Sequence, residues 1–277
     1  MLQAIDYQGP SAAKALVQSL RDTGFAVLKN HPLEQAQVNQ LYQQWAGFFK
    51  QPSKADYAIN SAAQDGYFGE DMAETAKGAS QRDLKEYFHY YPWGQCPKEL
   101  KANTQAYYQA ANELAIELLS WIEEASPTSV KKSFKSPLSE MIQNSQNTLL
   151  RILHYPPLKG NETPNAIRAA AHEDINLITL LPAASAKGLE VKLNNGEWFE
   201  IPLAFGYLVI NTGDMLQEAS SGYFPSTTHR VVNPALSDNG SRLSMPLFLH
   251  ARPDVVLSDR YTAGAYLKQR LIELGVY

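Results

Sequence analysis

The sequence has a single cysteine, Cys96, among 277 residues, so an intrachain disulfide is ruled out. This absence fits a protein of the reducing cytoplasm. No apolar run is long enough to cross a bilayer, and residues 1–6 lack the basic start and apolar stretch of a signal peptide. The sequence also lacks a large excess of positive or negative residues, since 24 basic and 28 acidic residues leave a net charge of −4. This balance argues against nucleic acid or an anionic membrane as the main partner.

Internal repeats, low-complexity segments and interdomain linkers are absent as well. The hydrophobic fraction of 44% is enough for a sizeable core, and the length fits one large domain. We therefore expect one structural unit with three parts. These are an N-terminal region of helices and strands (1–125), a β-rich core (145–255) and a C-terminal helix (256–277).

Helical patterns dominate the N-terminal part, whereas short strands dominate the rest. Ser11 and Gly24 are typical of the start and end of a first helix, and Pro127 ends a long later one. From Thr148 onward, short apolar strands alternate with turns such as the Asn-Gly turn at 194–196. The pattern predicts an α+β protein built around a β-sandwich or jelly roll.

The first chemical signal is the H-x-D triplet formed by His172 and Asp174. In an extended strand, side chains two positions apart project to the same face, so this pair supplies two corners of a metal site. The best candidate for the third ligand is His229. Two histidines and one carboxylate that leave open positions are typical of non-haem Fe(II) oxygenases. The alternative is that His172 is an ordinary strand-end histidine and Asp174 caps a turn.

A second signal lies further along the chain, at Arg242 and Ser244. These residues are again two positions apart, so the guanidinium and the hydroxyl share one strand face. Together they can hold a carboxylate through an arginine fork and a hydroxyl hydrogen bond. A metal triad followed by a carboxylate clamp is a much rarer coincidence than an isolated H-x-D.

The order of these motifs resembles the Fe(II)/2-oxoglutarate-dependent dioxygenases, specifically the isopenicillin N synthase-like branch. The similarity extends over nearly the whole chain. It includes the approach to the metal (168–174), an N-x-G-D segment (211–214), the run into the distal histidine (222–231) and short N-terminal matches (5–6, 24–25, 30–31).

The resemblance implies a double-stranded β-helix (cupin-like jelly roll) with N-terminal and C-terminal helices packed on it. It implies Fe(II) on His172, Asp174 and His229, with 2-oxoglutarate as cosubstrate and O2 as oxidant. Oxidative decarboxylation of 2-oxoglutarate would then be coupled to hydroxylation or desaturation of a small-molecule substrate. Arg242 and Ser244 would bind the far end of the 2-oxoglutarate.

Tyr155 matches the tyrosine that reaches the 2-oxoglutarate carboxylate in relatives. The sequence departs from the family at Leu153, where relatives often have asparagine. It also has a longer interval between the distal histidine and Arg242, and the excess lies in the polar turn at 237–241. An insertion in such a turn costs little stability, so we keep Arg242 as the anion anchor.

The substrate side is predicted from aromatic residues. Tyr67 lies in a Gly-Tyr-Phe-Gly segment that we expect to form a mobile substrate lip, and Tyr87 and His89 share one face of an expected strand. Plain packing explains these aromatic residues equally well. The motifs leave open two rival functions, namely a 2-oxoglutarate-independent iron oxidase of the same branch and a jelly roll that binds metal without catalysis.

Overall fold

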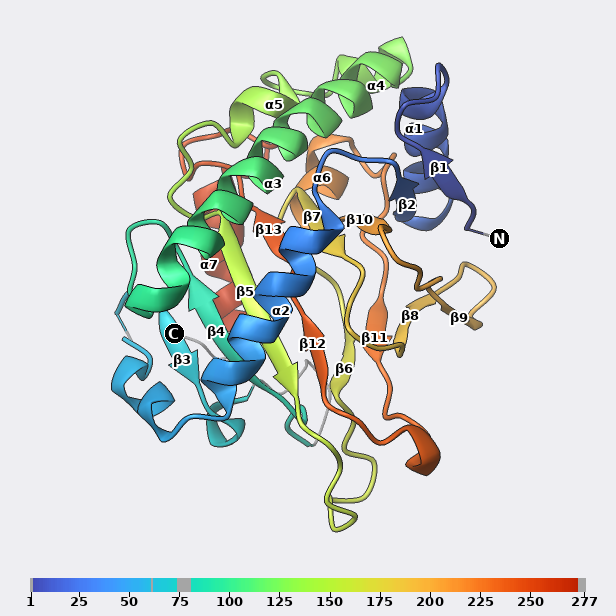
Figure 1. Ribbon diagram of the computed structural model, residues 1–277. Coiled ribbons are helices and arrows are strands. Elements are labelled where there is room, and N and C mark those ends of the chain that lie inside the picture. Colours follow the sequence, from blue (N-terminus) through green and yellow to red (C-terminus); the bar gives the residue numbers. More distant parts are fainter. Residues whose placement is uncertain (1, 61, 74–80, 274–277) are drawn as a thin grey trace.

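The computed structural model describes residues 2–60, 62–73 and 81–273. Two β-sheets form the centre of the molecule (Figure 1). The large sheet has the strand order β1 (Ala4–Asp6), β2 (Phe25–Lys29), β10 (Leu208–Thr212), β7 (Ile178–Pro182), β13 (Leu247–Leu249), β5 (Leu149–Tyr155), β4 (Glu86–Tyr90) and β3 (Gly66–Phe68), with β12 (Arg242–Ser244) also paired to β5.

The small sheet has the order β6 (Ala169–His172), β11 (His229–Val231), β8 (Leu189–Lys192) and β9 (Trp198–Glu200). Strands β8 and β9 form the hairpin predicted from the Asn-Gly turn. Apart from the parallel pair β1–β2, the strand pairs of both sheets are antiparallel. The strands therefore confirm the predicted jelly-roll core.

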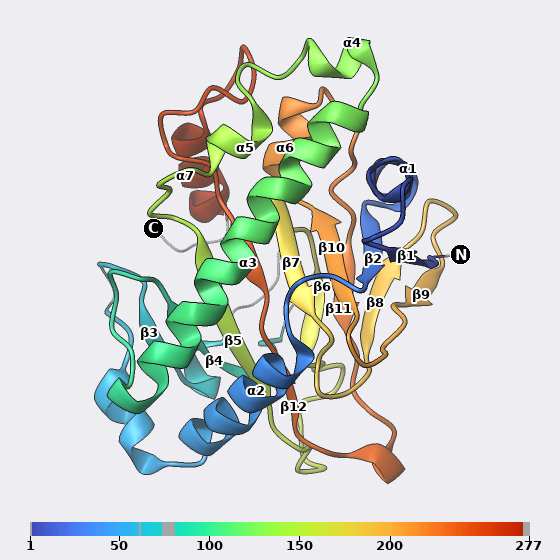
Figure 2. The same cartoon turned by 45° about the horizontal axis from the view of Figure 1, so that its top comes forward.

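The helices are α1 (Ala12–Thr23), α2 (Gln35–Phe49), α3 (Lys98–Ala125), α4 (Thr128–Lys131), α5 (Leu138–Met141), α6 (Asp214–Ala219) and α7 (Ala263–Glu273). Helices α1, α2 and α3 pack against the outer face of the large sheet (Figure 2). Short 3₁₀ turns lie at Pro52–Tyr57, Glu70–Met72 and Leu236–Asp238. The C-terminal helix, expected over 256–277, begins only at Ala263 and runs to Glu273 among the described residues, because Val256 and Thr262 form a β-bridge before it; positions 274–277 lie outside the described residues.

One apolar core joins the helices to the large sheet. Helix α3 buries residues such as Leu114 and Leu118 against it, and Leu150 of β5 and Leu180 of β7 belong to the same cluster. The long helix begins directly after Pro97, which is compatible with a helix start but not with a helix interior.

Two smaller clusters fill the space between the sheets. Val209 of the large sheet and Val191 of the small sheet meet in one of them, and Leu153 and Val231 meet in the other. Alternation along each strand explains this arrangement, because one face contacts helices while the other faces the second sheet. The inner face of the large sheet therefore supplies the walls of any site between the sheets.

Candidate active site

The two histidines of the predicted triad face each other on neighbouring strands of the small sheet. His172 is the last residue of β6 and His229 the first of β11, and the two residues are directly opposed in the antiparallel pair. Directly opposed side chains in such a pair lie about 5 Å apart on one face. Their ring centroids are 4.4 Å apart. The register of two strands thus joins residues that are far apart in the sequence.

Asp174 completes the cluster from the turn that follows β6. Its Oδ1 lies 3.7 Å from Nε2 of His229 and 4.0 Å from Nε2 of His172. One potential ligand atom from each residue lies within 4.8 Å of the others, and it is the only such cluster found among the described residues. A single divalent ion at the centre of this cluster would have three ligands and open positions, which is the arrangement for non-haem iron.

Both imidazole rings are oriented by backbone carbonyl groups. Nδ1 of His172 lies 2.8 Å from the carbonyl of Ala170, and Nδ1 of His229 lies 3.1 Å from that of Thr227. A carbonyl can only accept, so Nδ1–H donates and the Nε2 lone pair is left for a metal. Burial, followed by the neighbouring His229, lowers the pKa of His172 to about 4, which keeps the ring neutral at neutral pH.

The two oxygens of Asp174 have different neighbours. Oδ2 accepts hydrogen bonds from Oγ1 of Thr179 at 2.6 Å and from Nδ2 of Asn211 at 2.8 Å, whereas Oδ1 faces the histidines. Burial alone would raise the pKa of Asp174, but the two histidines and these two donors together lower it. The carboxylate is therefore held ionised and in one orientation.

Thr179 and Asn211 were not singled out from the sequence as site residues. They lie on the inner faces of β7 and β10, where they form a directly opposed pair. Gly213 supports the same region, since a Cβ at this position would lie 2.2 Å from the backbone oxygen of Asn176. The N-x-G-D segment therefore packs directly against the turn that carries Asp174.

The anion clamp lies on β12, beside β5. Arg242 is opposite Tyr155 and Ser244 is opposite Leu153. The Arg242 side chain is 1% exposed, and its Nε donates to the carbonyl of Ala186 at 3.0 Å. Burial lowers the pKa of Arg242, although a guanidinium stays charged at neutral pH.

The surroundings of Arg242 are suited to binding an anion. Its Nη1 is buried and has no hydrogen-bond partner among the described residues. No carboxylate of the described residues forms an ion pair with this side chain either. A buried cation without a counter-charge is costly, and a bound carboxylate removes that cost. The residues at this position therefore fit one end of a dicarboxylate such as 2-oxoglutarate.

The predicted substrate residues divide between the two faces of the large sheet. Tyr87 and His89 lie on the inner face of β4, where Tyr87 belongs to a cluster between the sheets. Nδ1 of His89 lies 2.8 Å from the carbonyl of Gln64, so Nδ1–H donates to it. Its Nε2 accepts from Nε of Arg151 at 2.9 Å. His89 therefore orients an arginine on the inner face of β5.

The third predicted substrate residue, Tyr67, lies on the face of the large sheet that packs against the helices. Strand β3 pairs with β4 so that Tyr67 is opposite Phe88, and both point to the helices. The Tyr67 hydroxyl donates to Oε2 of Glu86 at 2.5 Å, and its ring contacts Phe48. Phe68 takes the inner position instead, with its ring 4.6 Å from that of Tyr87.

The Gly-Tyr-Phe-Gly segment, which we expect to form a mobile lip, lies at an edge of the large sheet. Residues 66–68 form the edge strand β3, with Gly66 opposite His89. A Cβ on Gly66 would lie 2.6 Å from the backbone oxygen of Tyr57, and the φ angle of Gly66 is +98°. This glycine therefore serves close backbone packing of an edge strand.

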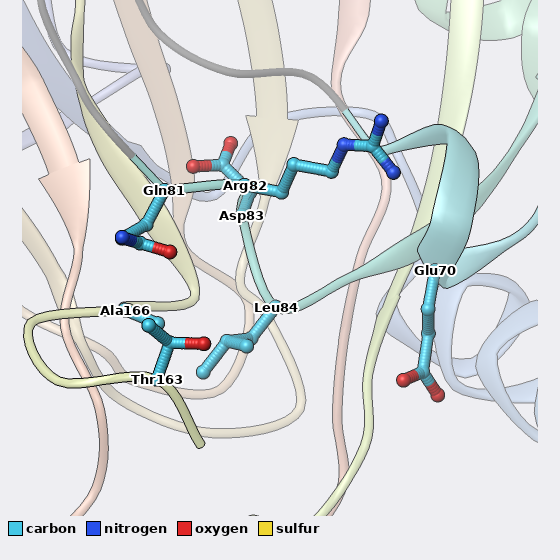
Figure 3. Close-up of a pocket in the computed structure, with 7 residues that line it drawn as sticks. All are labelled: Glu70, Gln81, Arg82, Asp83, Leu84, Thr163 and Ala166. Atoms are coloured by element: carbon cyan, nitrogen blue, oxygen red, sulfur yellow. The ribbon is translucent and has the colours of Figure 1, made fainter.

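A hollow of about 460 Å³ lies beside the segment that leads into β4 (Figure 3). It is lined by residues from the segment before β4, from the 3₁₀ turn at Glu70 and from the loop between β5 and β6, namely Glu70, Gln81, Arg82, Asp83, Leu84, Thr163 and Ala166. Asp83 joins the hollow to β6, because its Oδ1 accepts from the backbone N–H of Ala170 at 2.9 Å. Its Oδ2 pairs with Lys85 at 2.8 Å. The hollow itself does not include the triad.

In the part of the chain that the structure describes, no helix has the length and apolarity needed to cross a membrane.

Comparisons with known proteins agree with this site. Residues 146–251 match the 2OG-Fe(II) oxygenase superfamily, and residues 2–112 match the family described as non-haem dioxygenase in morphine synthesis N-terminal. A solved structure of a putative oxygenase from Shewanella oneidensis is 55% identical, with a TM-score of 0.90 and coverage of 100% of this chain and 99% of that chain.

Two further relatives extend the comparison. A putative 2OG-Fe(II) oxygenase family protein from Caulobacter crescentus is 32% identical with a TM-score of 0.82, and the match covers 99% of both chains. The proline hydroxylase buaE of Petromyces alliaceus is 28% identical over 98% of this chain and 99% of its own length. The chain therefore belongs to the 2OG-Fe(II) oxygenase family and is an iron(II)- and 2-oxoglutarate-dependent oxygenase.

Proposed function

We propose that His172, Asp174 and His229 are the iron ligands of this oxygenase. The observation that carries the assignment is the convergence of two Nε2 atoms and one carboxylate oxygen, all oriented by hydrogen bonds on their far sides. The Nδ1–H hydrogen bonds of both histidines leave Nε2 for a metal, and the Asp174 carboxylate is held ionised. Such outer hydrogen bonds typically accompany metal-binding histidines and carboxylates.

We propose further that Arg242, Ser244 and Tyr155 hold the distal carboxylate of 2-oxoglutarate. These three residues lie on adjacent strands, and the Tyr155 ring centroid is 5.1 Å from Cζ of Arg242. The bound iron, with O2 and 2-oxoglutarate, supplies oxidation of the substrate coupled to release of succinate and CO2. One oxygen atom of O2 enters succinate and the other is available for hydroxylation of the substrate.

The substrate is proposed to be a small molecule that lies between the two sheets. Phe68, Tyr87 and His89 form a continuous aromatic wall on the inner face of the large sheet, with ring centroids 4.4–5.0 Å apart. A curated relative is named a proline hydroxylase, which is consistent with a substrate of this size. The single cysteine and the need for reduced iron support a cytoplasmic location.

The test measures CO2 and succinate release, with and without a library of small molecules, in the wild type and in two variants. His172→Ala should abolish iron binding and turnover, whereas Arg242→Ala should raise the 2-oxoglutarate requirement without removing iron. His154→Gln is the matched control, because His154 lies on β5 but faces Glu86 and Ser241 away from the triad. It should retain iron affinity.

The rival functions give different results in the same assay. Substrate-dependent O2 uptake without a 2-oxoglutarate requirement would favour the 2-oxoglutarate-independent oxidase. Iron binding without any O2 consumption would favour a non-catalytic metal-binding protein. Full iron affinity in His172→Ala would overturn the ligand assignment.

A further inference from the structure

A second buried arginine lies beside the proposed 2-oxoglutarate anchor. Arg168 directly precedes β6 and is 1% exposed, like Arg242. Its Cζ lies 6.0 Å from the centroid of the Tyr155 ring, and that of Arg242 lies 5.1 Å from the same centroid. Two guanidinium groups therefore surround one phenol ring in the interior of the protein.

Both guanidinium groups lack a counter-charge in the described part of the chain. The ion pairs of the described residues include neither Arg168 nor Arg242. Nε of Arg168 and Nη1 of Arg242 are buried without a hydrogen-bond partner. Burial, and then the charge of Arg242, lowers the pKa of Arg168. Two like charges at one buried position are costly unless an anion joins them.

A purely structural role does not account for this arrangement. Nη2 of Arg168 donates to the carbonyl of Gly240, two positions before Arg242. Asn233, in the loop between β11 and β12, already ties that loop to the segment before β6. Its Oδ1 accepts from the Arg168 backbone N–H at 3.0 Å, and its Nδ2 donates to the carbonyl of Ala166 at 2.9 Å. A neutral donor at position 168 could make the bond to Gly240. The buried charge of Arg168 therefore needs another explanation.

We propose that Arg168 is a second cationic positioning residue of the 2-oxoglutarate pocket, which makes the pocket selective for a 2-oxo acid with a second carboxylate. The proposal rests on the proposed role of Arg242. Arg242 contacts the distal carboxylate, while Arg168 adds a positive charge from the segment before β6, beside the Tyr155 ring, and holds the loop before β12 through Gly240. A charge several ångströms away in a buried site changes affinity by about tenfold.

The experiment separates the charge of Arg168 from its hydrogen bond. Arg168→Gln keeps a donor for Gly240 and removes the charge, whereas Arg168→Lys keeps the charge. The readouts are the calorimetric Kd of N-oxalylglycine in Mn(II)-loaded protein without O2, the KM for 2-oxoglutarate, and the KM for 2-oxohexanoate, which lacks the second carboxylate. Arg168→Gln should weaken N-oxalylglycine binding and raise the 2-oxoglutarate KM about tenfold with kcat within about twofold. The lysine variant should stay close to the wild type.

Selectivity distinguishes the proposal from a loss of folding. The 2-oxohexanoate KM should be unchanged in Arg168→Gln, because this ligand has no carboxylate at the far end. Asn233→Ala is the structural control and should lower the melting temperature without changing the Kd of N-oxalylglycine. An unchanged Kd in Arg168→Gln, or an equal loss for both 2-oxo acids, would overturn the role of Arg168.

The proposed function has its own control in the same series. Arg242→Ala should weaken N-oxalylglycine binding more than either Arg168 variant does. If Arg242→Ala has no effect, the 2-oxoglutarate pocket itself is misplaced. If Arg242→Ala weakens binding and Arg168→Gln does not, the pocket stands and only the second cation is wrong.

Discussion

At the scale of single residues, the site depends on ligand side chains whose other polar atoms already form hydrogen bonds within the protein. Asp174 keeps one oxygen for Thr179 and Asn211 and directs the other to the histidines. His172 and His229 use Nδ1 for backbone carbonyls and direct Nε2 inward. The polar atoms that remain free of protein partners thus point at one position, which lowers the reorganisation needed when a metal binds.

The Asp174 contacts lead to a prediction for iron affinity. Thr179→Val has nearly the same shape as the wild-type residue but removes the hydroxyl that donates to Oδ2 of Asp174. Loss of an outer hydrogen bond of this kind lowers metal affinity by about 10- to 100-fold. The measurement is Fe(II) titration without O2, with Thr179→Ser as the control that restores the donor. Equal affinity in the valine and serine variants would contradict this role for Thr179.

A second prediction at this scale concerns pH. Burial is the main reason that the pKa of His250 falls to about 4, and its Nδ1 has no hydrogen-bond partner among the described residues. In the unfolded chain a histidine has a pKa near 6.5, so between about pH 4 and 6.5 the unfolded state binds more protons. The contribution of His250 to stability is therefore present above pH 6.5 and is lost as the pH falls through this range.

Urea unfolding of the metal-free protein at pH 5 and pH 7 measures this effect. His250→Asn removes the titrating group, so the loss of stability between the two pH values should be smaller than in the wild type. Below about pH 4 the contribution of His250 should change no further, so both proteins should then lose stability with falling pH at the same rate, through their carboxylates. An identical pH dependence in both proteins would mean that His250 does not titrate abnormally.

At the scale of elements, the register of paired strands decides which side chains reach the site. The pairing of β3 with β4 places Phe68 opposite Tyr87 on the inner face, and it places Tyr67 opposite Phe88 on the helix side. A shift of one residue would exchange these roles, because side chains alternate along a strand. The same logic places Arg242 and Tyr155 together across β12 and β5.

The strand register predicts opposite phenotypes for two tyrosines. Tyr67→Phe removes a hydrogen bond to Glu86 on the helix side, so it should lower stability by about 1–2 kcal/mol and leave the substrate KM unchanged. Tyr87→Ala opens the aromatic wall between the sheets, so it should raise the substrate KM by about tenfold or more. Thermal unfolding and steady-state kinetics on a substrate from the library separate the two effects. A substrate KM that depends on Tyr67 but not on Tyr87 would contradict the assignment of faces.

At the scale of the whole molecule, the N-terminal region completes the large sheet. Strands β1 and β2 lie at one edge of it and β3 and β4 at the other, while the catalytic strands lie between them or in the facing sheet. Helices α1, α2 and α3 share one apolar cluster with β5, β7 and β13. The expected division at about residue 125 therefore crosses a continuous core.

This arrangement predicts cooperative folding of the full chain. A fragment of residues 126–277 loses both edges of the large sheet and the helices that bury its outer face, so it should remain unfolded. The full chain should unfold in one transition. Near-ultraviolet circular dichroism and Fe(II) binding of the fragment provide the measurement, with the full chain as control. A fragment that folds and binds iron would show that the N-terminal region is a separate domain.

The sequence by itself determined the chemistry of the site, because that chemistry depends on local spacing. A period of two places Arg242 with Ser244 on β12, and the short H-x-D spacing keeps Asp174 beside His172 although Asp174 lies in the turn after β6 rather than in the predicted strand. The jelly-roll core followed from short strands with turn residues between them. These features depend on neighbours within a few positions, which a single sequence records directly.

Only the tertiary structure decided what depends on pairing between distant segments. The register of β11 against β6 brings His229 to His172, and that of β3 against β4 turns Tyr67 away. The donors to Asp174 and the second arginine at Tyr155 come from other strands, and no local pattern marks them. Register is set by the packing of both sheets at once, so the face on which Tyr67 lies does not follow from its own segment alone.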